Sequence, residues 1–89
     1  MDLRLAPINI KDAYEFCMNR GQTVHGDFNL AVSCVNGEGA ILGIIILHHT
    51  GLTFRLVHLY TDATSLVGSL LYGAAWRAAK ALGYKQITL

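Results

Sequence analysis

The chain of 89 residues has the length of one small domain. Only 15% of its residues are charged, and the net charge is +1. Because the sequence has no run of basic residues, the composition argues against electrostatic binding of nucleic acid. The longest apolar run, Ala40 to Leu47, is too short to span a membrane, and Asp2 and Arg4 interrupt the apolar pattern that a secretory signal needs.

Two local patterns at the start of the chain predict a short strand and a helix. Asp2 to Ala6 alternates weakly in hydropathy and a proline follows, which is typical of a strand at a sheet edge. We expect a helix over about Lys11 to Asn19, because Asn9 or Asp12 can cap its start. The pair Arg20–Gly21 then ends this helix with a basic residue and a C-cap glycine.

The middle of the chain predicts a β-hairpin. Asp27 to Val35 alternates in part, and Asn36 to Gly39 follows as a tight turn, because an Asn-Gly pair supplies the positive φ that such turns need. Ala40 to His48 is the most apolar segment of the chain. A strand that is apolar on both faces is expected at the centre of a sheet that is covered on both sides. His49 to Gly51 forms the next turn.

The last third of the chain predicts a strand, a turn, a helix and a strand. Phe54 to Tyr60 alternates and is rich in aromatic and β-branched residues, and Thr61 to Ser65 is a turn rich in helix-capping types. A helix is expected over Leu66 to Leu82, with Gly83 as its C-cap, before a final strand from Tyr84 to Leu89. Its apolar stripe is expected at Leu66, Leu70, Ala74, Ala78 and Leu82, and Val67, Leu71 and Ala81 are expected to widen it.

These elements predict a single α/β domain over residues 1–89, in the order β-α-β-β-β-α-β. The three middle strands are expected to form an antiparallel meander. The last strand is expected to pair in parallel beside the fourth, through a right-handed βαβ unit, with helices on both faces of the mixed sheet.

One long segment resembles a known family. Thr61 to Tyr84, TDATSLVGSLLYGAAWRAAKALGY, is similar to a group of small GNAT-superfamily (N-acetyltransferase-like) proteins from phages and prophages. Members of that group tend to have TDGT, a short polar stretch ending in Ser, and then LYxAAWRAAxxxGY. Leu3 to Ile8 and Val24 to Phe28 fit the group more weakly. The resemblance implies a GNAT-like mixed sheet that is truncated after its fifth strand.

The resemblance also implies that acetyl-CoA is the cofactor. The amides of the turn and of the first helical turn would hold its pyrophosphate, and its pantetheine arm would lie along Arg55 to Tyr60. The free amides and the dipole of a helix N-terminus favour a diphosphate by on the order of a few kcal/mol. The implied cofactor-binding residues are Leu59, Thr61, Asp62, Ala63, Thr64, Ser65, Val67, Gly68, Ser69 and Leu70.

The sequence departs from this group at the residues that would do the chemistry. The group has a glutamate in the fourth strand where this chain has Arg55, and a guanidinium cannot act as a base at neutral pH. Of the His-Arg-His run that follows the first helix in the group, Arg20 alone corresponds. His58 is then the acid–base candidate, and Tyr60 is the candidate to protonate the leaving thiolate.

The cysteines and histidines do not predict a disulfide or a metal site. Cys17 and Cys34 do not form a disulfide framework, and we expect two buried free thiols in a reducing cytoplasm. His48 and His49 are adjacent, so in a strand they point to opposite faces. Because no pair of His or Cys residues has the spacing of a zinc site, we expect no metal.

Two functions follow as alternatives. The first is an acetyltransferase that passes an acetyl group from acetyl-CoA to an amine of a protein or a nucleobase. The second is a catalytically inactive protein that blocks a host defence protein, such as a CRISPR effector, and Lys85 to Leu89 would then be an open edge strand for pairing. A bare structural domain, or a fragment of a longer enzyme, is the third alternative.

The apolar content predicts a partner. Because 53% of the residues are hydrophobic in so small a domain, we expect a partner to cover some apolar surface, most simply in a homodimer. A host protein is the other partner that we consider, and we expect no membrane association. Trp76, Arg77 and Lys80 are expected on the outer face of the last helix, where they could also form an interface.

Overall fold

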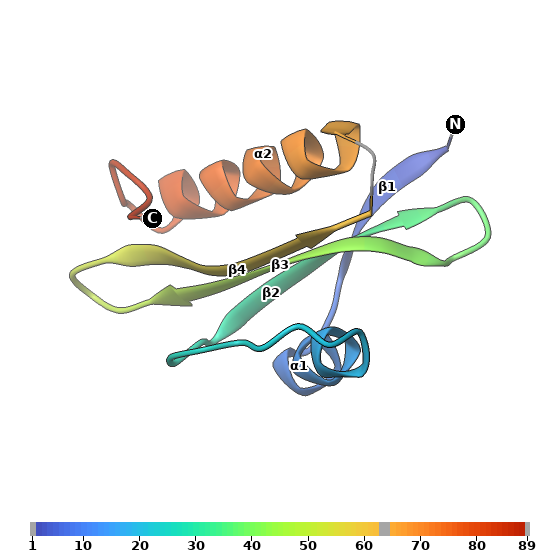
Figure 1. The fold of residues 1–89 in the computed structure, drawn as a ribbon. Helices are drawn as coiled ribbons and strands as arrows, with labels where there is room; N and C mark the ends of the chain where they lie inside the picture. The colour runs from blue at the N-terminus through green and yellow to red at the C-terminus, as the bar shows by residue number, and fades with distance from the viewer. Residues whose placement is uncertain (1, 63–64, 89) are drawn as a thin grey trace.

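The computed structural model describes residues 2–62 and 65–88 and contains one sheet between two helices. The strands β1, β2, β3 and β4 lie side by side in that order, and each pairs with its neighbour in the antiparallel sense. Helix α2 lies on one face of the sheet and α1 on the other (Figure 1). The elements in chain order are β1 (Leu3–Pro7), α1 (Ile10–Asn19), β2 (Leu30–Asn36), β3 (Ile41–His49), β4 (Phe54–Thr61) and α2 (Ser65–Ala81).

The prediction of a mixed sheet with a parallel βαβ unit is wrong. The four strands of the sheet are all antiparallel, so the chain has a small α+β fold in the order β-α-β-β-β-α. The predicted last strand, from Tyr84 onwards, does not form within the described residues. Its one pairing is an isolated parallel bridge between Thr88 and Arg55. Leu89 lies outside the described residues.

The residues that follow α2 close the end of the helix and pack on Phe54, and these contacts explain why the predicted strand does not form. The Tyr84 N–H donates to Ala79 O (2.8 Å), which closes the end of the helix around Gly83 in its left-handed conformation (φ 90°). The Tyr84 ring then packs against Phe54, with 5.4 Å between the ring centroids. A ladder needs several consecutive pairings, and Thr88 alone reaches β4 among the described residues.

The central place of β3 is confirmed. This strand lies between β2 and β4, and Ile44, Ile45, Ile46 and Leu47 are fully buried in it. Because successive side chains point to opposite faces, β3 supplies both apolar layers of the molecule. The α1 layer contains Ala13, Cys17, Val24, Ala31, Ile44 and Ile46. The α2 layer contains Cys34, Ile45, Leu47, Phe54, Val67, Leu71, Ala75 and Ala79.

Helix α2 packs on the sheet through one side of the predicted stripe, the side that includes Val67 and Leu71. Its buried residues are Val67, Leu71, Ala75 and Ala79, whereas Leu66 is 53% exposed. The centre of the buried face therefore lies one residue beyond the predicted centre, because nearly every side of this helix is apolar and the spacing alone does not select a face. The helix comes closest to the sheet over Gly43, where an added Cβ would lie 2.6 Å from Val67 Cγ1.

The β2–β3 turn forms where it was predicted but by a different mechanism. The positive φ occurs at Gly39 (82°), and not in the Asn36–Gly37 pair. Instead, the Asn36 side chain closes the turn, because its Oδ1 accepts from the N–H groups of Glu38 (2.9 Å) and Ala40 (3.0 Å). An asparagine that folds back on its own backbone in this way is an Asx turn.

Strand β4 contains a bulge at Val57. The register against β3 shifts between Ile46 and Leu47, so that Val57 is an extra residue in β4. Leu56 therefore packs against the α2 layer and Val57 against the α1 layer, and after the bulge Leu59 returns to the α2 layer. The bulge decides which side chains of β4 face α1.

Both cysteines are free and fully buried, as predicted. Cys17 belongs to the α1 layer and Cys34 to the α2 layer. Burial raises the pKa of both thiols above the ordinary value. The charge of Asp62 raises the pKa of Cys34 further, whereas Arg20 partly offsets the effect of burial on Cys17. Both thiols are therefore kept protonated and unreactive at neutral pH.

Asn9, one of the two predicted caps, caps α1. Its Oδ1 accepts from the Asp12 N–H (2.8 Å), and its Nδ2 donates back to Asp12 Oδ2 (3.0 Å). This reciprocal pair satisfies a helix N–H that otherwise lacks a partner.

We expect Asn9→Ala to lower the free energy of unfolding by about 1 kcal/mol, because the alanine cannot accept from the Asp12 N–H. Urea unfolding followed by circular dichroism measures this change. Asn9→Ser is the matched control, since a serine hydroxyl can still cap the helix, and its cost should be clearly smaller. Equal stability of Asn9→Ala and the natural chain would contradict the capping role.

Candidate functional site

The candidate residue Tyr60 lies on the α1 side of β4 in a cluster with Phe16 and Arg20. The Phe16 and Tyr60 rings meet edge to face, with centroids 5.6 Å apart. The Arg20 guanidinium carbon lies 3.5 Å from the centroid of the Phe16 ring and 5.9 Å from that of Tyr60. Phe16 thus holds a cation beside the tyrosine, through edge-to-face and cation–π contacts that each contribute about 1 kcal/mol.

The end of α1 places Arg20 in this cluster. Arg20 is the C-cap residue, and its N–H donates to Cys17 O (3.1 Å). Phe16 precedes it by four residues, which is one helical turn, so both side chains lie on the same side of the helix. The sequence singled out Arg20 as the basic residue at the end of the helix and through the resemblance, and it treated Phe16 as part of the helix. Their contact with Tyr60 depends on the packing of α1 across the sheet.

The second candidate, His58, is half-buried on β4 and pairs across the sheet with Ile46, whose side chain belongs to the α1 layer. Its Nε2 atom is buried and has no hydrogen-bond partner among the described residues. An unpaired buried polar atom costs about 1–3 kcal/mol, so functional sites are where such atoms are expected. Because His58 and Tyr60 share a face of β4, the structure brings both candidates to one side of the sheet.

Arg55 does not belong to this cluster. It lies at the start of β4, and its Nη2 is 3.5 Å from the place where a Cβ on Gly26 would lie. Tyr60 lies five positions further along the strand, a span of roughly 15 Å. Arg55, which stands where the GNAT-like proteins that the sequence resembles have a glutamate, therefore reaches the loop before β2.

The outer edge of β4 is open beside Tyr60. The Asp62 N–H donates inward to Leu42 O (2.9 Å), so alternation directs the peptide groups of Leu59 and Thr61 outward. On this edge, the chain after α2 reaches β4 at its beginning, where the Leu56 N–H donates to Thr88 O (2.8 Å). Within the residues that the structure describes, no strand pairs with the rest of this edge.

Some of the predicted cofactor-binding residues have side chains in the core. Leu59 and Leu70 pack against the α2 layer, and Val67 is fully buried within it. Thr61 is half-buried, and its Cγ2 lies 3.8 Å from the place of a Cβ on Gly68. These residues could serve a ligand mainly through their backbone.

The remaining predicted cofactor-binding residues lie around the turn that leads into α2. The Asp62 amide is engaged by Leu42, as described above, so it is not a donor for a phosphate. Ser69 is exposed on the first turns of α2. Ala63 and Thr64 lie outside the described residues, as does the side chain of Ser65, which begins the helix.

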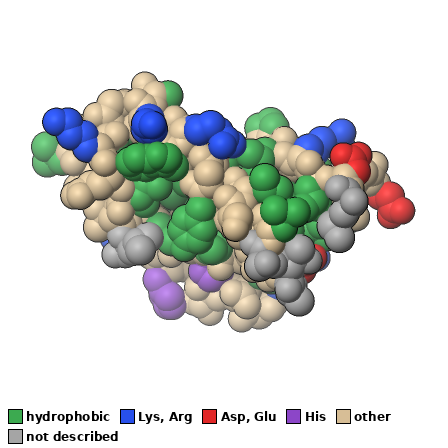
Figure 2. Space-filling view, turned by 90° about the horizontal axis from the view of Figure 1, so that it is seen from above, with side chains coloured by type: hydrophobic (Ala, Val, Ile, Leu, Met, Phe, Trp, Pro, Cys, Tyr) green, Lys and Arg blue, Asp and Glu red, His purple; other side chains and the backbone are tan. Residues whose placement is uncertain are grey.

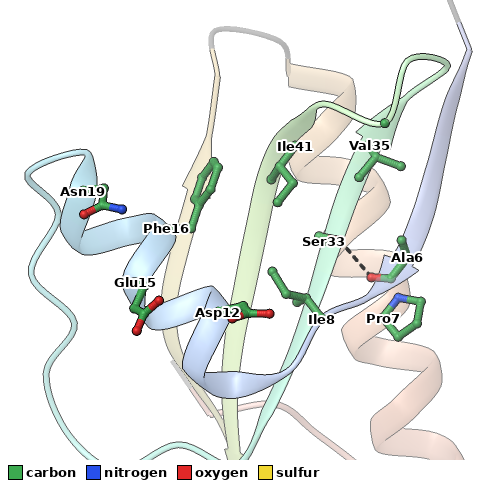
Figure 3. A pocket seen from close by; sticks show the side chains of 11 residues that line it. Ala6, Pro7, Ile8, Asp12, Glu15, Phe16, Asn19, Ser33, Val35 and Ile41 are labelled. Carbon is green, nitrogen blue, oxygen red and sulfur yellow. Dashed lines mark hydrogen bonds between the residues drawn. The ribbon is translucent and has the colours of Figure 1, made fainter.

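A pocket of about 490 Å³ lies on the same face of the sheet as Tyr60, between α1 and the strands β1, β2 and β3 (Figure 3). Phe16 lines it and so joins the pocket to the Arg20 cluster. Val35 and Ile41 form apolar parts of its wall, and α1 adds Asp12, Glu15 and Asn19. No pattern in the sequence indicates this pocket, because four separate elements line it.

The described residues offer no arrangement for a metal ion or for a membrane span. They contain no group of three or more His, Cys, Asp or Glu side chains that could hold a metal. His49 stacks on Phe54, with 6.2 Å between the ring centroids, and so belongs to the packing around that ring. None of the helices in residues 2–62 and 65–88 is long and apolar enough to cross a membrane.

The sequence matches no protein-family model, and it matches no curated protein.

Proposed function

We propose that this chain binds acetyl-CoA where β4 leads into α2 and transfers the acetyl group to an amine. The observation that carries the proposal is the open edge of β4 beside Tyr60. A free strand edge pairs readily with an extended amide-bearing chain, and the pantetheine arm is such a chain. The resemblance of Thr61 to Tyr84 to GNAT-like proteins supports the same ligand.

In this mechanism the side chains on the α1 side of β4 move the protons. The amine nitrogen attacks the thioester carbonyl carbon, a C–N bond forms and the C–S bond breaks. His58 Nε2, which has no partner among the described residues, accepts the proton that the amine loses. The Tyr60 hydroxyl donates a proton to the leaving thiolate, so that the products are an amide and CoA.

Arg20 supports this chemistry as a positioning residue. Phe16 holds its guanidinium beside the Tyr60 ring, as the distances of 3.5 and 5.9 Å to the two ring centroids describe. A fixed cation near the reacting groups stabilises the negative charge that develops on the thiolate and on the tyrosine oxygen. The two buried free thiols and the use of acetyl-CoA both fit a cytoplasmic location.

We expect calorimetric titration with acetyl-CoA to show micromolar binding, with free CoA measured alongside it. Replacing Gly68 and Ser69 by glutamates should weaken this binding at least about tenfold, because two carboxylates would repel the pyrophosphate. Both sites can accept a side chain, since Ser69 is exposed and a Cβ on Gly68 meets its nearest atom at 3.8 Å.

The matched control places two glutamates at the other end of the same helix. Lys80 and Ala81 are exposed in its last turn, so their replacement should leave the affinity for acetyl-CoA unchanged. Absence of binding to the natural chain at millimolar acetyl-CoA would refute the proposed function.

A second candidate function is partner binding without catalysis, as in an inhibitor of a host defence protein. It is favoured by exposed apolar residues of α2 and its end, since Trp76 is 40% exposed and Leu82 is 52% exposed. Figure 2 shows hydrophobic side chains at the surface of this face of the molecule. Lys80 Nζ lies 5.6 Å from the centroid of the Trp76 ring, and Trp is enriched at interfaces. A partner bound tightly with no change in its mass would favour this function over acetyl transfer.

A further inference from the structure

We infer that the amine acceptor is an aliphatic diamine or polyamine that binds in the pocket between α1 and the sheet. This inference rests on the proposed acetyl transfer and names its substrate class. The pocket has a volume of about 490 Å³, which is within the range of about 300–1,000 Å³ that small-molecule sites occupy.

The charges that line the pocket select a cation. Asp12 and Glu15 lie three residues apart on α1 and both line the pocket, while no Lys, Arg or His is among the described residues that line it. Asp12 uses one of its two oxygens to accept from Asn9. The Ser33 hydroxyl, also in the wall, donates to Ala6 O (2.9 Å) and is satisfied within the protein. The carboxylates are therefore the charged groups that a ligand meets.

The walls of the pocket favour a ligand whose two amino groups are joined by an aliphatic chain. Val35, Ile41 and Phe16 provide apolar surface against which methylene groups can pack (Figure 3). A nucleobase within a nucleotide or a nucleic acid is disfavoured, because the attached phosphates would approach two carboxylates. A second amino group suits the chemistry, since one nitrogen must lose its proton to attack while the other can stay charged and bind the carboxylates.

The pocket lies at the end of the sheet where the donor is proposed to bind. Ile41, in its wall, precedes Leu42, whose carbonyl accepts from the Asp62 N–H at the end of β4. Phe16, in the opposite part of the lining, contacts the Tyr60 ring. An amine held by the carboxylates on α1 could therefore extend its second nitrogen past Phe16 toward Tyr60.

Titration of the full chain with putrescine, followed by NMR chemical shifts, tests this inference. We expect shifts at Phe16 and Ile41, and an affinity for putrescine about tenfold higher than for n-butylamine, which has one charge. Butanediol, which has none, should not bind. Glu15→Gln should weaken putrescine binding about tenfold and leave acetyl-CoA binding unchanged. Asp27→Asn, which removes an exposed carboxylate outside the pocket, should change neither.

The outcomes separate this inference from the proposed function. Acetyl-CoA binding without putrescine binding, or putrescine binding that Glu15→Gln does not weaken, would overturn the inference and leave acetyl transfer standing. A lysine-containing peptide that binds more tightly than putrescine would overturn it in favour of a protein acceptor. Putrescine binding that Glu15→Gln weakens, in a chain that does not bind acetyl-CoA, would support the amine pocket and refute acetyl transfer.

Discussion

Gly43→Ala is expected to lower the free energy of unfolding by about 3 kcal/mol, a large share of the stability of so small a domain. The new Cβ would lie 2.6 Å from Val67 Cγ1, 2.9 Å from the Tyr60 carbonyl oxygen and 3.0 Å from Leu71 Cδ1. Neither the backbone of β4 nor the buried face of α2 can withdraw without opening the α2 layer. Urea unfolding followed by Trp76 fluorescence and by circular dichroism measures the loss.

Gly51→Ala is the matched control for this substitution. A Cβ at Gly51 meets no atom within 4 Å, and Gly51 does not have a positive φ. Its effect should stay within about 0.5 kcal/mol. The double variant Gly43→Ala with Val67→Ala should not recover full stability, because the contact with the Tyr60 oxygen remains and a cavity is added. If both single glycine variants are equally stable, α2 does not pack on β3 as closely as the structure describes.

Tyr60→Phe should lower the kcat of acetyl transfer about hundredfold or more, while the affinity for acetyl-CoA and the stability stay close to those of the natural chain. The ring that packs against Phe16 is kept, and the hydroxyl that protonates the thiolate in the proposed mechanism is lost. The rate is measured from the CoA thiol released with a diamine as acceptor. Thermal unfolding checks that the packing is intact.

Tyr72→Phe serves as the control for the loss of a tyrosine hydroxyl. Tyr72 is 42% exposed on α2, the helix on the opposite face of the sheet from Phe16 and Arg20. Its replacement should leave the rate unchanged. If Tyr60→Phe retains the full rate, the thiolate takes its proton from another group, and Tyr60 then serves the packing around Phe16 and Arg20.

Local signals in the sequence were enough for most of the elements. Asn9 as a cap and Gly83 as a C-cap mark helix ends, and the all-apolar pattern around Ile45 indicates a central strand. The prediction of the last strand was wrong, because the pairing of one strand with another depends on distant parts of the chain. A segment that looks like a strand needs a free edge and enough residues, and here Thr88 alone pairs with β4 among the described residues.

The candidate site was predictable by residue type and not by arrangement. His58 and Tyr60 could be chosen because imidazole and phenol groups can move protons. Phe16 and Arg20, the neighbours of Tyr60, come from the end of a helix about forty residues earlier in the sequence, and packing alone brings them to Tyr60. In the same way, the buried stripe of α2 is decided by the absence of a side chain at Gly43 in another element.

The bulge at Val57 has a consequence for how β4 tolerates change. Along a regular strand, successive side chains enter the two layers in strict alternation. The extra residue Val57 shifts this alternation by one position. Phe54 and Leu56 enter the α2 layer before it, and Leu59 enters the same layer out of phase with them. Deleting this one residue would leave the two layers beyond it unchanged, because Leu56 already lies opposite Leu47 and His58 opposite Ile46, as in a regular strand. Tyr60 would stay beside Arg20 and Leu59 under α2, so Val57 is the residue of β4 whose loss the strand should tolerate best.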